Sequence, residues 1–201
     1  FSIVPQAGST HFADIFTNST HLWALSDGAT ENKVFRYKVD GTYDNFQFST
    51  DPAGISAPDA IYFNGTYFWI TDDSTNTVHR FTQDGVQQSS FSVPEASRPW
   101  GITFNETYFW IATSGSSVVR YNQTGHFNSS TFSTAPYDVG PEGIVFDGNF
   151  YYTVGNKNHS VAQFDREGVF QGYLVNVSEN NTVLTAHGIA FDGRYLYIGD
   201  D

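Results

Sequence analysis

The stretch Ile61-Tyr-Phe-Asn-Gly-Thr-Tyr-Phe-Trp69 decides the fold, because related versions of it occur five times along the chain. The other four versions begin at Ile15, Ile102, Ile144 and Ile189. Their turn residues fall at positions 18, 64, 105, 147 and 192, so the spacings are 46, 41, 42 and 45 residues. A repeat of about 40–45 residues made of short strands is typical of a β-propeller, in which each repeat forms one blade.

The second repeat shows the order of strands expected within one blade. Residues 60–63 are predicted to form the inner strand, and Asn64-Gly65 predicts a type I′ turn, which needs positive φ at both positions. Three further strands follow at residues 66–71, 78–81 and around 91–93. Pro94 then ends the ladder, because proline has no N–H group to donate.

The whole chain is therefore predicted to be one all-β domain, residues 1–201, with the architecture of a five-bladed propeller of four-stranded blades. The blade repeats lie near 10–52, 57–94, 98–136, 140–175 and 187–201. Residues 1–5, Phe1-Ser-Ile-Val-Pro5, match the outer strand and are expected to complete the last blade. No third strand for that blade follows in the sequence, so we expect it to be incomplete in this chain. A longer chain, more blades or another subunit would each explain this.

Composition excludes some classes of partner. The formal net charge is −12 and only nine Lys and Arg residues are present, which argues against binding to nucleic acid phosphates. No apolar run approaches the length of a membrane-spanning helix. Cysteine is absent, so the redox compartment cannot be inferred from disulfides.

Asparagine carries the main signal for localisation. Eight Asn-x-Ser/Thr sequons occur, about three times the number expected by chance. Because Asn, Ser and Thr all favour turns, part of this excess has a structural explanation. We nevertheless predict covalent N-linked glycans and an extracellular or cell-surface protein. The candidate glycosylation sites are Asn18, Asn64, Asn105, Asn122, Asn128, Asn158, Asn176 and Asn180.

The motif Pro141-Glu-Gly-Ile-Val-Phe-Asp-Gly148, followed by an aromatic strand, resembles the NHL-repeat and gluconolactonase-like β-propellers. Residues 186–193 and 98–102 carry the same resemblance. The likeness consists of turn and core residues, so it is informative about the fold and weak about function. It implies that ligands bind where the residues preceding the inner strands converge. Here these residues are expected to be Phe12, Asp59, Trp100, Glu142 and His187.

Three members of this ring suggest chemistry. Asp59, Glu142 and His187 together could bind a divalent cation such as calcium or zinc, or supply an acid and a base. The residues that follow the second strands could join them; these are Asp72, Asp73, Asn156, Asp200 and Asp201. Two ring members are aromatic, and the enzymes resembled use a more regular ligand set. This departure argues against a catalytic site, a bound metal and a cofactor.

The sequence thus favours a non-catalytic, N-glycosylated extracellular structural or interaction module, plausibly the repeating subunit of a filament or surface layer. Self-association would use blade edges or strand donation. The alternative is a secreted, metal-assisted hydrolase or lyase acting through Glu142, His187 and Asp59. A glycan-binding propeller ranks last, because the repeated aromatic residues Trp23, Trp69, Trp110, Tyr152 and Tyr197 lie in strands, where packing between blades explains them.

Overall fold

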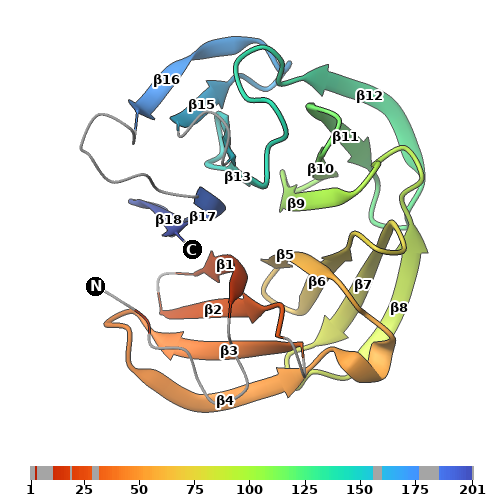
Figure 1. Cartoon of the computed structure of the whole chain (residues 1–201), viewed down its shortest axis with the longest axis vertical. Helices are drawn as coiled ribbons and strands as arrows, with labels where there is room; N and C mark the ends of the chain where they lie inside the picture. The colour runs from red at the N-terminus through yellow and green to blue at the C-terminus, as the bar shows by residue number, and fades with distance from the viewer. Residues whose placement is uncertain are drawn as a thin grey trace.

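The computed structural model describes residues 3, 11–18, 20–28, 32–155, 160–176 and 186–200. Its strands form four four-stranded sheets and one two-stranded sheet, arranged like blades around a common centre (Figure 1). Neighbouring strands within each sheet are antiparallel and follow one another in the chain. The predicted all-β propeller is confirmed.

The blades divide the chain in order. Blade 1 contains β1 (Phe12–Thr17), β2 (His21–Ser26), β3 (Lys33–Lys38) and β4 (Tyr43–Ser49), and a short 3-10 helix, η1 (Asp51–Ala53), follows it. Blade 2 contains β5 (Pro58–Phe63), β6 (Tyr67–Asp72), β7 (Thr77–Thr82) and β8 (Gln87–Ser92). Blade 3 contains β9 (Pro99–Phe104), β10 (Phe109–Thr113), β11 (Ser117–Tyr121) and β12 (Phe127–Ser133). Blade 4 contains β13 (Gly143–Phe146), β14 (Tyr151–Gly155), β15 (Ser160–Phe164) and β16 (Phe170–Asn176).

The fifth sheet is incomplete, as the sequence predicts. In the described part of the chain it consists of β17 (Ala186–Phe191) and β18 (Leu196–Asp200) alone. The predicted outer strand at residues 1–5 lies outside the described residues except for Ile3, which packs against a cluster of buried side chains in blade 1. Within the described residues, no helix is long and apolar enough to cross a membrane.

The first turn of blade 2 differs from its prediction. Gly65 has a positive φ of 90°, but Asn64 does not, so a type I′ turn centred on Asn64-Gly65 is wrong. The N–H of Asn64 donates instead to the carbonyl of Tyr67, which makes Gly65 and Thr66 the central residues. The Asn64 side chain explains the shift, because its Oδ1 accepts the N–H groups of Thr66 and Tyr67 at 3.0 and 2.8 Å.

Aromatic side chains on the second strand of the first four blades fill the space between blades, whereas Tyr197 of blade 5 is only partly buried and donates to Asp192. Trp23, Trp69, Trp110 and Tyr152 are only 6%, 3%, 4% and 6% exposed. Trp23 of blade 1 packs with Phe63 and Phe68 of blade 2, at ring-centroid distances of 5.4 and 5.7 Å. Such burial removes a large apolar area from water, so these residues stabilise the fold rather than form a sugar-binding ladder.

A second contact joins neighbouring blades at three of the joints in the described part of the chain. The outer strand of blades 1, 2 and 3 carries Phe48, Phe91 and Phe132, whose Cβ atoms lie against the third turn of the following blade at Gly85, Gly125 and Gly168. A Cβ added at these glycines would lie 2.3–2.4 Å from the Phe Cβ. All three glycines also have φ between 80° and 83°. Only glycine meets both requirements at this joint.

The inner strands approach one another closely near their starts. A Cβ added at Gly143 of β13 would lie 2.8 Å from the carbonyl oxygen of His187 in β17. A Cβ at Gly101 of β9 would lie 3.0 Å from the carbonyl oxygen of Glu142. These close approaches bring Trp100 and Glu142, which precede the two glycines, to the same end of the inner strands as His187. The repeat thereby positions the candidate site.

Candidate functional site

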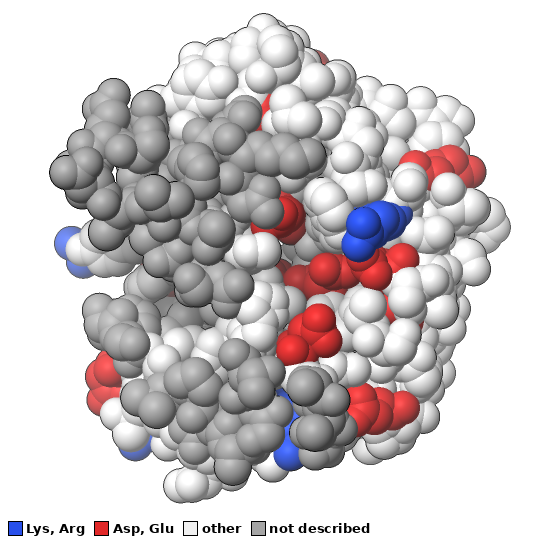
Figure 2. Space-filling model, viewed as in Figure 1, with Lys and Arg blue, Asp and Glu red and all other residues white. Residues whose placement is uncertain are grey.

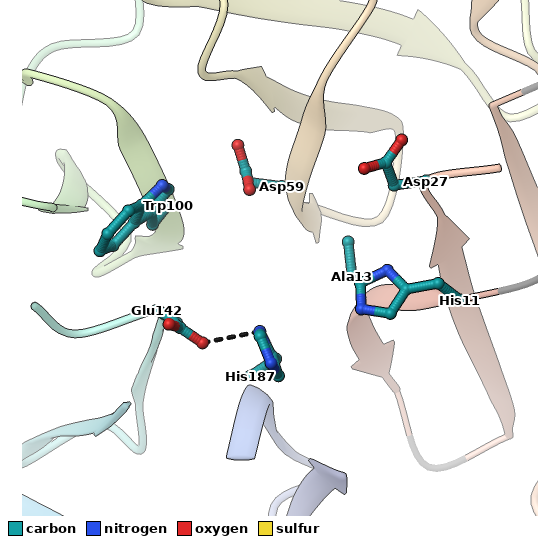
Figure 3. A pocket seen from close by; sticks show the side chains of 7 residues that line it. All are labelled: His11, Ala13, Asp27, Asp59, Trp100, Glu142 and His187. Atoms are coloured by element: carbon teal, nitrogen blue, oxygen red, sulfur yellow. Dashed lines mark ion pairs between the residues drawn. The ribbon is translucent and has the colours of Figure 1, made fainter. Parts of the chain in front are cut away.

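A pocket of about 200 Å³ opens where the five inner strands begin. It is hereafter called the polar pocket. It is lined by His11, Ala13, Asp27, Asp59, Trp100, Glu142 and His187 (Figure 3). Each of the five blades contributes one residue that lies five positions before its turn residue, and two further residues come from blade 1. The predicted convergence of Asp59, Trp100, Glu142 and His187 is therefore confirmed as a matter of geometry.

The fifth predicted member of the ring, Phe12, is wrong. Counting five positions back from Asn18 leads to Ala13, and it is Ala13 that lines the pocket. The pairing of β1 with β2 is irregular between Phe12 and Asp14. Phe12 packs instead edge-to-face against Phe35, at 6.3 Å between ring centroids. Blade 1 thus contributes a small side chain at this ring position.

Glu142 and His187 form an ion pair at the pocket wall. The Nδ1 atom of His187 lies 2.6 Å from Oε2 of Glu142, and the dashed line in Figure 3 marks this contact. The side chain of Glu142 is 14% exposed and that of His187 is 27% exposed. Glu142 comes just before β13 and His187 lies in β17, so the pair joins blades 4 and 5. A carboxylate beside one ring nitrogen fixes the orientation and the tautomer of the imidazole.

Asp59 faces the same space and retains a proton at neutral pH. Burial, together with the nearby carboxylates of Asp73 and Asp27, raises the pKa of its carboxyl to about 8 against the lowering effect of Arg98. Its Oδ2 atom is buried and has no hydrogen-bond partner among the described residues. Burial also raises the pKa of Asp27, which His11 opposes. The pocket therefore contains a neutral carboxylic acid beside a histidine–carboxylate pair.

The basic side chain of Arg98 lies beside the pocket residue Trp100 and is already engaged. Arg98 donates to Oδ2 of Asp73 through Nε and Nη2 at 2.9 and 2.8 Å. Its guanidinium carbon also lies 5.2 Å from the centroid of the Trp100 ring. Acidic side chains gather around the middle of the face seen in Figure 2.

The remaining predicted positions divide into three groups. Asp72 is fully buried and stabilises the loop that follows it, where it accepts hydrogen bonds from Ser74 and Thr75. Asp73 does not line the pocket and is instead paired with Arg98 at 2.8 Å. Asn156 and Asp201 lie outside the described residues, as does the side chain of Asp200.

Sequence reasoning missed His11 and Asp27. A signal for Asp27 existed, because it lies nine residues after the turn residue Asn18, as Asp73 lies nine residues after Asn64. No comparable signal marks His11, which precedes the first strand and contacts His187 edge-to-face at 5.8 Å between ring centroids. Only the closure of blade 1 against blade 5 brings these two histidines together.

The polar pocket does not supply a ready set of metal ligands. Among the residues that the structure describes, no three His, Asp or Glu side chains are grouped closely enough to hold a metal ion. Glu142 and His187 are paired with each other, and Asp59 lies apart from them across the pocket (Figure 3). We therefore derive no chemical step through a calcium or zinc ion.

Known structures share this fold. Glutaminyl cyclase from Myxococcus xanthus matches all of this chain and 91% of its own, with a TM-score of 0.77 and 9% identity. The fold is a β-propeller of the NHL type. A catalytically inactive virginiamycin B lyase from Staphylococcus aureus with quinupristin matches 98% of this chain, with a TM-score of 0.63 and 19% identity. A chain of the nidogen–laminin complex matches 88% of it, with a TM-score of 0.67 and 15% identity.

These likenesses establish the architecture alone, because all of the identities are below 20%. The chain spans 65% of the lyase chain and 66% of the nidogen–laminin chain. No family model and no curated protein sequence matches this chain.

Proposed function

We propose that the polar pocket is the active site of an enzyme that carries out acid–base chemistry on a small substrate, as a hydrolase or lyase does. One observation carries the proposal. A histidine–carboxylate pair with a 2.6 Å contact shares a recessed pocket with a buried carboxylic acid that is protonated at neutral pH. A group that can accept a proton and a second group that holds one, placed in the same pocket, are the usual arrangement for a general base and a general acid.

The roles follow from the environments of the residues. Glu142 orients the imidazole of His187 and stabilises its positive charge, so His187 is the base that accepts a proton from the substrate. Asp59 keeps its proton because burial disfavours its charged form, so Asp59 is the acid that donates a proton to the leaving group. Two of the structural neighbours are enzymes by name, which is consistent with this assignment.

Turnover assays with the two substrates indicated by these neighbours test the proposal. We expect the protein to open quinupristin or to cyclise a peptide with an N-terminal glutamine, and His187→Ala to lower the rate at least about 100-fold, the usual contribution of a general base. Asp84→Asn, an exposed change in the third turn of blade 2, is the control and should keep the rate. A protein inactive on both substrates, or a fully active His187→Ala variant, would contradict the proposal.

A second candidate function is the glycosylated extracellular interaction module. The first turn of the blades, where several sequons lie, favours it. Asn64 holds its turn through Oδ1, whereas Asp147 holds the equivalent turn of blade 4 in the same way, accepting the N–H groups of Asn149 and Phe150 at 2.7 Å. The turn therefore accepts either residue. What asparagine adds is an amide nitrogen, the atom that carries an N-linked glycan.

The placement of the other sequons supports this candidate to different extents. Asn18 and Asn64 are exposed. Asn105 donates its amide nitrogen to the hydroxyl of Tyr151 at 2.8 Å, which makes it the less accessible of the first-turn sequons. Asn158 and Asn180 lie outside the described residues, as does the side chain of Asn176.

Intact-mass measurement on the secreted protein tests this candidate. We expect a mass above that of the polypeptide, and we expect Asn64→Asp to remove one glycan while it preserves the fold, because Asp147 and Asp192 already occupy this position in blades 4 and 5. Electron microscopy of the same sample should show assemblies. A mass equal to that of the bare chain, together with single dispersed particles, would exclude the glycosylated assembling module.

A further inference from the structure

A second pocket, of about 290 Å³, opens at the other end of the inner strands. It is hereafter called the aromatic pocket. All five blades contribute to it through β1, β5, β9, β13 and β17, which surround the common centre in Figure 1. Along β1, Ala13 lines the polar pocket and Ile15 lines the aromatic pocket, with the buried Asp14 between them. The two pockets are therefore separate sites.

Aromatic side chains from every blade line this second pocket. They are Phe16, Tyr62, Phe104, Phe146 and Phe191. The ring centroids of Phe16 and Tyr62 are 5.5 Å apart, and those of Tyr62 and Phe104 are 6.1 Å apart. All five side chains are only partly buried, so each keeps some contact with water. A ligand that covers these rings would remove apolar surface from water, which is favourable.

The space in the pocket arises from a difference between the repeats. Two positions before the turn residue, blades 1 and 2 carry the large rings of Phe16 and Tyr62. Blades 3, 4 and 5 carry Thr103, Val145 and Ala190 at the same position, and these smaller side chains also line the pocket. The three smaller side chains leave room across from the two rings. A flat molecule that stacks against the rings would fit this asymmetric space.

The charge of the pocket disfavours an anionic ligand. Within the described part of the chain, Asp192 is the one charged residue of the lining. Hydrogen bonds, above all that from the N–H of Tyr195, lower the pKa of Asp192, so it is ionised at neutral pH. The carboxylate of Glu106 is also close enough to act on Tyr62. An aromatic carboxylate would meet both negative charges.

The lining offers a polar group as well as rings. Burial raises the pKa of the Tyr62 hydroxyl to about 12, with a smaller contribution from Glu106, so the hydroxyl keeps its proton. None of the described residues accepts a hydrogen bond from it. The hydroxyl of Thr103, in contrast, already accepts the N–H of Phe146 at 3.2 Å. Tyr62 can therefore donate to an acceptor atom on a ligand.

We propose that the aromatic pocket binds a small uncharged aromatic molecule of one or two fused rings that carries a hydrogen-bond acceptor. The ring system stacks against Phe16 and Tyr62 and occupies the room beside Val145 and Ala190, and its acceptor receives the Tyr62 hydroxyl. A volume of about 290 Å³ is at the lower end of the range of about 300–1,000 Å³ found for ligand pockets, which suits a ligand of this size. This site goes beyond the proposed function and does not depend on it.

Titration with quinoline, which has two fused rings and one ring nitrogen and is uncharged at neutral pH, tests the inference. The methyl signal of Ala190, assigned through Ala190→Ser, is followed by NMR. We expect a saturable shift of this signal and an unchanged indole N–H signal of Trp100, which lines the polar pocket. Quinoline-6-carboxylate should bind at least about ten-fold more weakly, because its charge would be brought into an apolar pocket without a basic partner.

Two variants test the geometry of the site. Val145→Phe gives blade 4 the ring that blade 1 carries as Phe16, so it should fill the space and weaken quinoline binding at least about ten-fold. Tyr62→Phe keeps the ring and removes the hydroxyl, so binding should weaken about five-fold. Val86→Leu, which adds one methylene at an exposed turn, is the control and should leave binding unchanged.

His187→Ala should also retain quinoline binding, although the proposed function needs this residue for turnover, so the two proposals can fail separately. The methyl signals of the other residues show whether each variant is folded. A lack of saturable shift, a shift of the Trp100 signal in place of the Ala190 signal, equal binding of the carboxylate, or unchanged binding in folded Val145→Phe or Tyr62→Phe would each overturn the inference.

Discussion

Gly125→Ala is expected to destabilise the protein by about 4 kcal/mol, because two costs coincide at this position. Gly125 has φ +81°, a conformation that costs about 1–2 kcal/mol for a residue with a Cβ. The added Cβ would also lie 2.4 Å from the Cβ of Phe91, which belongs to the outer strand of the preceding blade. Relieving this contact requires the two blades to separate, and overpacking of this kind typically costs about 1–3 kcal/mol.

Gly65→Ala isolates the conformational part of that cost. Gly65 has φ +90°, but nothing lies within 4 Å of the position that its Cβ would occupy. This variant should therefore lose only about 1–2 kcal/mol. Chemical denaturation of both variants, with the midpoint and slope compared, gives the difference directly. Equal losses would show that the contact between Phe91 and the third turn of blade 3 does not hold the blades together.

Asp14→Asn is expected to make the protein more stable at alkaline pH, by several kcal/mol at pH 8.5. Asp14 is 8% exposed, and its Oδ2 accepts the N–H of Ile61 at 2.9 Å. Its Oδ1 lies where Gly188 allows close approach, since a Cβ there would be only 2.5 Å away. The side chain thus sits between the inner strands of blades 1, 2 and 5. An amide keeps an oxygen for Ile61 and cannot ionise.

The pH dependence follows from the direction of the shift. Burial raises the pKa of Asp14 from 3.8 to about 8, although the backbone N–H groups of Ile61, Ile15 and Ile189 oppose it. Between these two values the folded protein binds a proton that the unfolded chain has released, so stability falls as the pH rises. The penalty is absent below about pH 3.8, grows by at most about 1.4 kcal/mol per pH unit, and is complete above about pH 8.

Unfolding free energies at several pH values from 5 to 8.5 check this expectation. Asp14→Asn should show a shallower decline than the unchanged protein. Some decline should persist, because burial also raises the pKa of Asp59 to about 8 and that of Asp138 to about 6. Asp84→Asn serves again as the variant of equal charge, and its profile should match that of the unchanged protein. Parallel profiles for Asp14→Asn would mean that Asp14 carries no penalty.

Local patterns in the sequence account for most of the architecture. The repeated turn residues and alternating aromatic residues predict the blades, the strand order and the buried positions such as Trp69, because a blade is made of neighbouring hairpins. One local error, the type I′ turn at Asn64, arose because a side chain competed with the backbone for the turn hydrogen bonds. Counting residues from the turns also predicted that Asp59, Glu142 and His187 lie at one end of the inner strands.

The sequence by itself determined that this chain is a propeller and which end of its strands would carry polar groups, since both follow from a repeat that is local in the chain. Only the tertiary structure decided that Glu142 binds His187, that Asp59 keeps its proton, and that Asp27 and His11 join the pocket. Those properties depend on distances between blades and on the exclusion of water. Neither is encoded in any single repeat, because each arises only when five inner strands close around a common centre.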